Sequence, residues 1–172
     1  MDLKRYTRLS LLLALSVVLN TVESLIPIFN GMIPGLKIGL ANTVILFVLY
    51  EYSFKEAFYI TILRVFLTGI LLTGLFSVSF FFSLGGALLS IIMMYLFKKY
   101  TKLSMIGISI IGSIFHSLGQ IIVAIFLINT TSMFYYFPFL LIFSIPTGIF
   151  TGIIARELLK GYREIISTEG YH

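Results

Sequence analysis

The chain has 172 residues, of which 59% are hydrophobic and only 11% are charged, and its mean hydropathy is +1.07. A water-soluble domain carries about a quarter of its residues as charges. These values therefore exclude a soluble fold and predict an all-α integral membrane protein surrounded by lipid. The net charge of +5 is not accompanied by a basic helix or by alternating aromatic and basic residues, so nucleic-acid binding is not expected.

The lengths of the uncharged runs set the number of membrane crossings. Two such runs, 65–97 and 103–155, contain 33 and 53 residues. One helix crosses a bilayer with about 20 residues, so the first run holds the end of one span and all of the next, and the second run holds two spans. Turn residues at 73–74 and 129–132 mark the divisions. With two apolar stretches nearer the N-terminus, the sequence predicts six transmembrane helices.

We expect one membrane domain over 1–172, and its N-terminal apolar run is interpreted as a retained span because no convincing small-residue cleavage site precedes Glu23. The linker 27–36 is apolar and contains two prolines and two glycines, so we predict that it folds over the outer end of the bundle as a lid. The predicted spans are roughly 8–26, 37–51, 55–73, 76–97, 104–128 and 134–158, followed by a cytoplasmic tail over 159–172.

The basic residues predict the orientation, because Lys and Arg gather on the cytoplasmic side of short loops. With both termini inside, ten of the 12 basic residues lie in the cytoplasm. The exceptions are Lys37, at the outer mouth of the second span, and Arg64, about ten residues or ~15 Å into the third. A charge within the bilayer costs roughly 2.5–3.5 kcal/mol on insertion scales, so Arg64 must face the interior of the bundle.

Several other polar residues fall in the outer half of the membrane when positions are counted along each span. His116 and Gln120 are four residues apart and share one face of the fifth span. A pocket that opens outward and binds an anionic ligand is therefore predicted, lined by Lys37, Asn42, Arg64, His116 and Gln120.

A structural interpretation of the same residues stays open. Glu23 is the only acidic residue in that half, and it is expected to form a structural ion pair with Arg64 or Lys37. His116 and Gln120 would then only satisfy helix backbones. Asn42, beside a helix start, is as well suited to capping as to ligand contact.

Catalytic and metal-binding patterns are missing from the sequence. The chain has no cysteine and two histidines, one of them His172, which supply no ligand set of standard spacing. It also lacks a phosphate-binding loop with its lysine, a Ser-x-x-Lys dyad and a nucleophile elbow. We therefore expect neither enzymatic activity nor a cofactor nor a bound metal.

Small residues recur at intervals of four, as in Ser144, Gly148 and Gly152 of the sixth span. Such spacing allows helices to approach closely, either within the chain or against another subunit. Ser10 and Ala14 form a similar pair in the first span and are predicted to contact a membrane partner. The aromatic clusters at 80–82 and 135–137 fit either an interfacial belt or the wall of a pocket.

Four segments together resemble the Gx transporter family, which is also labelled heptaprenyl diphosphate synthase component I. Two are specific: Pro-Gly-x-Lys-x-Gly-x-Ala-Asn over 34–42 and His-x-x-Gly-Gln over 116–120. Leu63-Arg64-Val65 and the small-residue run over 82–90 accompany them, and the resemblance covers about 8–158. Ser117 departs from the family, which usually has Asn there, so a side-chain amide is not expected at that position.

The resemblance implies a six-helix membrane protein similar to the S components of energy-coupling factor transporters. Such components capture a micronutrient from outside the cell membrane and depend on a transmembrane coupling subunit and two ATPases. The substrate would be an isoprenoid, quinone or flavin-related precursor or another small anion. A catalytic prenyl synthase is excluded, because its Asp-Asp-x-x-Asp motifs are missing and Asp2 is the one aspartate. A non-catalytic accessory subunit of a prenyl synthase or membrane redox system is the alternative.

Overall fold

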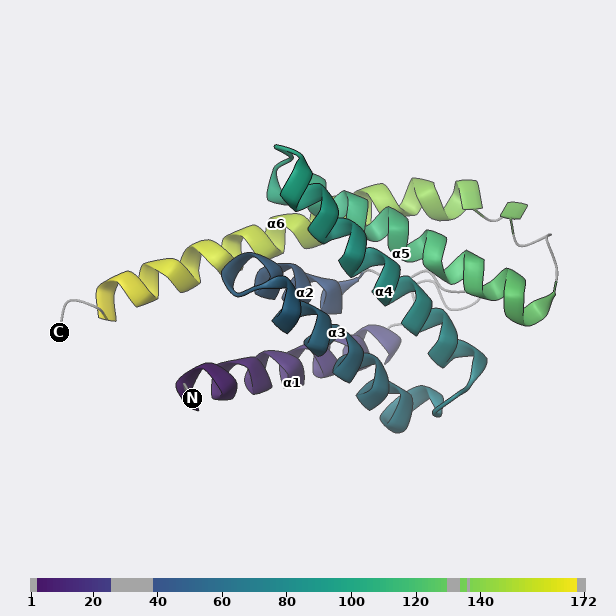
Figure 1. The fold of residues 1–172 in the computed structure, drawn as a ribbon, viewed down its shortest axis with the longest axis horizontal. Helices are drawn as coiled ribbons and strands as arrows, with labels where there is room; N and C mark the ends of the chain where they lie inside the picture. The colour runs from purple at the N-terminus through teal and green to yellow at the C-terminus, as the bar shows by residue number, and fades with distance from the viewer. Residues whose placement is uncertain (1–2, 26–38, 130–133, 136, 170–172) are drawn as a thin grey trace.

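The computed structural model describes residues 3–25, 39–129, 134–135 and 137–169, and these residues form helices and no strand. Figure 1 shows the helices as elongated rods that pack across one another. In chain order they are α1 (Leu3–Leu25), α2 (Leu40–Glu51), α3 (Phe54–Thr68), the π-helical turn η1 (Gly69–Thr73), α4 (Val78–Tyr100), α5 (Met105–Ile128) and α6 (Phe137–Glu169).

Five of the helices are long and apolar enough to cross a membrane, and α2, with 12 residues, is shorter. The predicted all-helical membrane fold is confirmed. The helix starts follow the local sequence, since the side chains of Ser53, Ser77 and Ser104 accept hydrogen bonds from backbone N–H groups in the first turns of α3, α4 and α5. Residues 37 and 38 of the predicted second span, and the predicted lid 27–36, lie outside the described residues.

The short helix α2 forms the centre of the packing. Every residue from Val44 to Leu49 is buried, and these residues belong to one apolar cluster that also includes residues of α1, α3, α4, α5 and α6. A helix that is apolar on all sides is stable only when other helices surround it. The low charge and short length of α2 therefore reflect burial inside the protein.

The helices α4, α5 and α6 form a tightly packed half of the bundle. A Cβ atom added at Gly119 of α5 would lie 2.5 Å from the backbone oxygen of Gly85 in α4. On the other side of α5, a Cβ atom at Gly148 of α6 would lie 2.6 Å from the Cα of Ile110. The small residues of α4 and α6 thus bring helices of this chain together, as the intramolecular interpretation of their spacing predicts.

Charged and hydroxyl groups join the other half, α1 to α3, to α6 at one end of the molecule. Arg5 of α1 pairs with Glu56 at the start of α3, and Arg163 of α6 pairs with Glu51 at the end of α2 over 3.1 Å. The start of α1 and the end of α6 also lie at this side in Figure 1. The distribution of Lys and Arg predicts that this end faces the cytoplasm.

The tyrosine hydroxyls at this end belong to the same network. Arg8 donates to the hydroxyl of Tyr162 over 3.1 Å, and that hydroxyl lies 3.4 Å from the hydroxyl of Tyr52. Burial, together with the hydrogen bond to Tyr162, raises the pKa of Tyr52 to about 12. Tyr52 therefore remains a neutral hydrogen-bonding group at physiological pH.

The last helix continues beyond the predicted end of its span at 158. Helix α6 runs to Glu169, so the segment expected as a cytoplasmic tail is helical. Leu159 and Tyr162 pack against the central apolar cluster, and the ion pair of Arg163 with Glu51 fixes the following turn. These contacts stabilise the part of α6 that continues beyond the apolar segment, which hydropathy alone does not predict to be helical.

Candidate binding cavity

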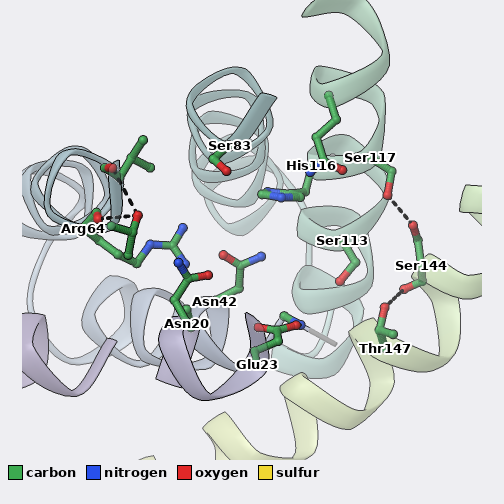
Figure 2. A pocket seen from close by; sticks show the side chains of 15 residues that line it. Asn20, Glu23, Asn42, Arg64, Ser83, Ser113, His116, Ser117, Ser144 and Thr147 are labelled. Atoms are coloured by element: carbon green, nitrogen blue, oxygen red, sulfur yellow. Dashed lines mark hydrogen bonds between the residues drawn. The ribbon is translucent and has the colours of Figure 1, made fainter. Parts of the chain in front are cut away.

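A polar cavity lies where the helices α1 to α3 meet α4 to α6, and each of the six contributes side chains to it (Figure 2). The unfilled space measures about 690 Å³ including its open mouth, of which about 50 Å³ is reachable by the centre of a water molecule. The lining residues are Asn20, Glu23, Gly39, Ala41, Asn42, Arg64, Val65, Thr68, Ser83, Ser113, His116, Ser117, Gln120, Ser144 and Thr147.

Arg64 supplies a buried positive charge to the cavity. Its side chain projects from α3, and only 6% of the residue is exposed. No ion pair within 4.0 Å and no side-chain hydrogen bond joins Arg64 to another described residue, and its buried Nε has no partner. A guanidinium carries five N–H donors and stays protonated in proteins. Arg64 therefore presents a charge whose counter-ion the described protein does not provide within pairing distance.

Glu23 is the acidic residue of the cavity, and it supports the backbone at the start of α2. It is 6% exposed, and its Oε1 accepts a hydrogen bond of 2.5 Å from the backbone N–H of Gly39. Gly39 has φ 84, a left-handed conformation that favours glycine. Glu23 attracts Arg64 electrostatically without pairing with it. The hydrogen bond to Gly39 thus gives this carboxylate a local structural role. The predicted ion pair of Glu23 stays a prediction, because none joins it to Arg64 within 4.0 Å and Lys37 lies outside the described residues.

The α5 wall carries Ser113, His116 and Gln120, spaced three, four and seven residues apart on one helical face. Gly86 of α4 packs directly against this wall, since a Cβ atom there would lie 2.9 Å from the backbone oxygen of His116 and from Cγ of Gln120. In Figure 2 the His116 ring points from α5 toward the side of the cavity that holds Arg64. The glycine thus lets α4 hold the α5 wall in position.

The α6 wall is made of hydroxyls that are already hydrogen-bonded. Ser144 lies 2.8 Å from the hydroxyl of Ser117 and donates to the carbonyl of Leu140, while Thr147 donates to the carbonyl of Phe143. Pro146 lies between them within the helix. Hydroxyl bonds to nearby carbonyls are one way in which a membrane helix tolerates proline.

Six side chains around the cavity retain unused hydrogen-bonding capacity. They comprise one guanidinium, three amides and two hydroxyls, and none makes a side-chain hydrogen bond to another described residue. Arg64 and Gln120 are buried and the other four are half-buried, and polar groups in such places are nearly always paired, so their partners are water or a ligand. The six residues are Asn20, Asn42, Arg64, Ser83, Ser113 and Gln120.

The structure brings four of the five predicted ligand-binding residues to this cavity, namely Asn42, Arg64, His116 and Gln120. The fifth, Lys37, lies outside the described residues. The predicted partner-contact residues Ser10 and Ala14 are exposed on α1, away from the cavity. The side chain of Asn42 makes no capping hydrogen bond at the start of α2, so it remains available to the cavity.

The aromatic clusters do not line the cavity. Phe80 packs against Phe66, with a ring-centroid distance of 5.4 Å, and against Phe81, near the end of α3 and the start of α4. Tyr135 is exposed. The described cavity wall therefore contains no phenylalanine or tyrosine.

Sequence reasoning did not assign Asn20, Ser113 or Thr147 to the pocket. Each lies three residues from another lining residue on the same helix: Asn20 from Glu23, Ser113 from His116, and Thr147 from Ser144. Polar residues that recur at three-residue spacing within a span are the signal that would have indicated them.

Metal binding finds no support within the described ranges, where no three His, Cys, Asp or Glu side chains come together. The fold and cavity define a multi-pass helical membrane protein with a polar interior site that contains one arginine and one glutamate. The chain belongs to the heptaprenyl diphosphate synthase component I family, whose sequence pattern matches residues 12–158. No curated protein and no solved structure matches it.

Proposed function

We propose that this protein is the substrate-binding membrane component of an energy-coupling factor type transporter, located in the cell membrane, and that its cavity captures a small anionic solute. The observation that carries the proposal is the buried Arg64 in the cavity wall, which forms no ion pair and no side-chain hydrogen bond with another residue that the structure describes. An ionisable residue kept at membrane depth without an internal partner usually marks a ligand or ion pathway. An anion that enters the cavity would complete its coordination.

The position of the cavity supports capture from outside. Arg64 is ten residues beyond Phe54, about 15 Å along α3 from the basic end. Asn42 lies in the first turn of α2, at the end opposite the ion pair of Glu51 with Arg163. The lining is therefore displaced from the cytoplasmic end toward the other face of the membrane.

The proposed experiment identifies what the protein carries. The detergent-solubilised protein is purified, denatured and analysed by mass spectrometry for released small molecules. We expect one small anion in near-stoichiometric amount. Its absence, with a soluble enzyme purifying alongside instead, would contradict the transport proposal.

The second candidate is a non-catalytic membrane subunit that anchors a prenyl diphosphate synthase, and the family's description as component I favours it. In that case the polar groups of the cavity serve only helix packing and bind water. The two candidates differ in what purifies with the protein: a small anion in one case, a soluble synthase without a ligand in the other. Neither makes this chain the catalyst, since its single aspartate cannot form the two Asp-rich motifs of a prenyl synthase.

A transporter of this kind needs a transmembrane coupling subunit and two ATPase subunits, because this sequence contains no nucleotide-binding loop. We propose α1 as the contact with the coupling subunit. Ser10 and Ala14 are exposed on it, beside the exposed Leu11 and Leu15. Small residues on a lipid-facing helix allow a second helix to approach closely.

Replacing both Ser10 and Ala14 by Leu is expected to abolish association with the coupling subunit. The added side chains would separate the helices, while the cavity residues would keep their positions. Co-purification from detergent measures the association, and release of the bound anion measures the cavity. Ser79→Leu, at an exposed position of α4, is the matched control. Equal recovery of the coupling subunit with the double variant and with the control would show that Ser10 and Ala14 are not part of the contact.

A further inference from the structure

The family's description points to prenyl compounds, but the described cavity wall has a different chemistry. Of its 15 lining residues, the three without a polar side chain are Gly39, Ala41 and Val65. A prenyl chain gains its affinity from burial against apolar side chains, and a flavin or quinone ring is usually held by aromatic ones. Among the described lining residues, Ala41 and Val65 are the only ones with an apolar side chain, and none is Phe, Tyr or Trp.

The unused hydrogen-bonding groups lie on more than one side of the cavity. Arg64 enters from α3, Asn42 from α2, and Ser113 and Gln120 from α5, while Ser83 enters from α4. Figure 2 shows Arg64 and His116 entering from different sides, with Asn42 between them. An oxyanion bound to Arg64 therefore leaves amides and hydroxyls facing the rest of the ligand.

The free space limits the size of the ligand in this conformation. The 50 Å³ reachable by water centres corresponds to roughly three to five water molecules, at about 10–15 Å³ each. This is room for an oxyanion with a short polar extension and not for a long chain or a fused ring system.

We infer that the ligand is a small hydrophilic oxyanion, a carboxylate or phosphate on a short hydroxylated skeleton, and that it has no prenyl tail. This inference rests on the proposed function of the cavity. The oxyanion pairs with Arg64, and the hydroxyl groups of the ligand bond to the amides and to Ser83 and Ser113. A site built from hydrogen-bonding groups rejects an analogue that lacks the matching hydroxyls, because its own polar groups are then left unpaired.

The test measures affinities of the purified full-length chain for matched pairs of probes. Glycerol 3-phosphate is compared with propyl phosphate, and glycerate with propionate, so that the members of each pair share a carbon skeleton and differ in hydroxyls. Geranyl diphosphate is compared with inorganic diphosphate. We expect the hydroxylated member of at least one pair to bind tenfold or more tightly than its partner, and geranyl diphosphate to gain less than threefold over diphosphate.

Variants link the preference to the cavity. Replacing both Ser83 and Ser113 by Ala is expected to reduce the hydroxyl preference at least fivefold while affinity for the unhydroxylated probe stays the same. Ser79→Ala, at an exposed position, is the control. Two results would overturn the inference of a hydrophilic ligand and leave the anion-binding function standing. One is that geranyl diphosphate binds at least tenfold more tightly than inorganic diphosphate. The other is that the hydroxylated and unhydroxylated members bind equally in both pairs. Binding of no oxyanion would overturn the proposed function and this inference with it.

Discussion

Arg64→Ala is expected to abolish most ligand binding, with a loss of about 2–5 kcal/mol, roughly 30- to 5,000-fold in Kd. Arg64 is 6% exposed, lines the cavity and forms no ion pair with a described carboxylate, so the ligand's anionic group is its expected counter-ion. Arg64→Lys should recover little of the affinity, because a point charge does not reproduce the bidentate contact of a planar guanidinium with an oxyanion. Equilibrium binding of the co-purified anion, measured on detergent-solubilised protein, checks both variants.

A measurement of stability separates this role from a structural one. If Arg64 served only to hold the bundle together, its removal would destabilise the ligand-free protein. The described protein pairs it with no carboxylate, and burying an uncompensated charge is unfavourable. Removal of Arg64 also ends its attraction to the buried Glu23, so the two effects oppose each other, and we expect Arg64→Met to change the stability of the ligand-free protein by no more than about 1 kcal/mol.

The matched control is Arg156→Ala, which removes an exposed arginine that pairs with its neighbour Glu157. Exposed pairs contribute about 0–1 kcal/mol, so neither binding nor stability should change much. A folded Arg64→Ala variant that binds the anion like the wild type would show that Arg64 is structural and would leave Lys37 as the predicted cation of the pocket.

The number of helices, and the place of Arg64 on the inner side of the bundle, could be predicted because both follow from a count of residues along uncharged runs. A bilayer fixes how many residues a span needs, and a lone charge within such a run is easily recognised. Once spans are placed, the helical rise gives the level of each polar residue. That is why Asn42, Arg64 and His116 could be expected at one level before their contacts were known.

The remaining polar lining could not be predicted, because serine serves several purposes inside a membrane bundle. Ser90 donates to the backbone carbonyl of Gly112 over 2.8 Å and supports the contact of α4 with α5. Ser83, seven residues earlier on α4, faces the cavity and makes no such bond. The sequence around each is equally apolar, so only the arrangement of neighbouring helices separates a packing serine from a lining one.

The C-terminal end of α6 could not be predicted for a different reason. Hydropathy falls after residue 158, but the helix continues because Leu159 and Tyr162 reach the apolar cluster around α2. A contact between residues more than 100 positions apart, such as Arg163 with Glu51, leaves no trace in the local pattern. The end of a helix outside the membrane thus depends on tertiary contacts, which cannot be predicted from the hydrophobic periodicity of the sequence.

Gly119→Ala is expected to destabilise the protein by about 1–3 kcal/mol and to weaken ligand binding at the same time. The new Cβ would lie 2.5 Å from the backbone oxygen of Gly85 and 2.9 Å from the Cα of Gly86. Backbone atoms cannot rotate away as a side chain can, so α4 and α5 must move apart. His116 and Gln120 flank this position on α5, and their displacement would disturb the cavity wall.

Gly161→Ala is the matched control for this change, since it makes the same substitution within a helix where no atom lies within 4 Å of the added Cβ. Relief of the conformational cost of glycine should stabilise this variant by about 0.5–1 kcal/mol. Unfolding in detergent gives the stability of both variants, and binding of the co-purified anion reports on the cavity. If the Gly119→Ala protein proved as stable as the Gly161→Ala protein, the close approach of α4 to α5 at Gly119 would be contradicted. The α5 side chains would then lack the support that holds them around the cavity, because Gly86 reaches His116 and Gln120 only at that helix separation.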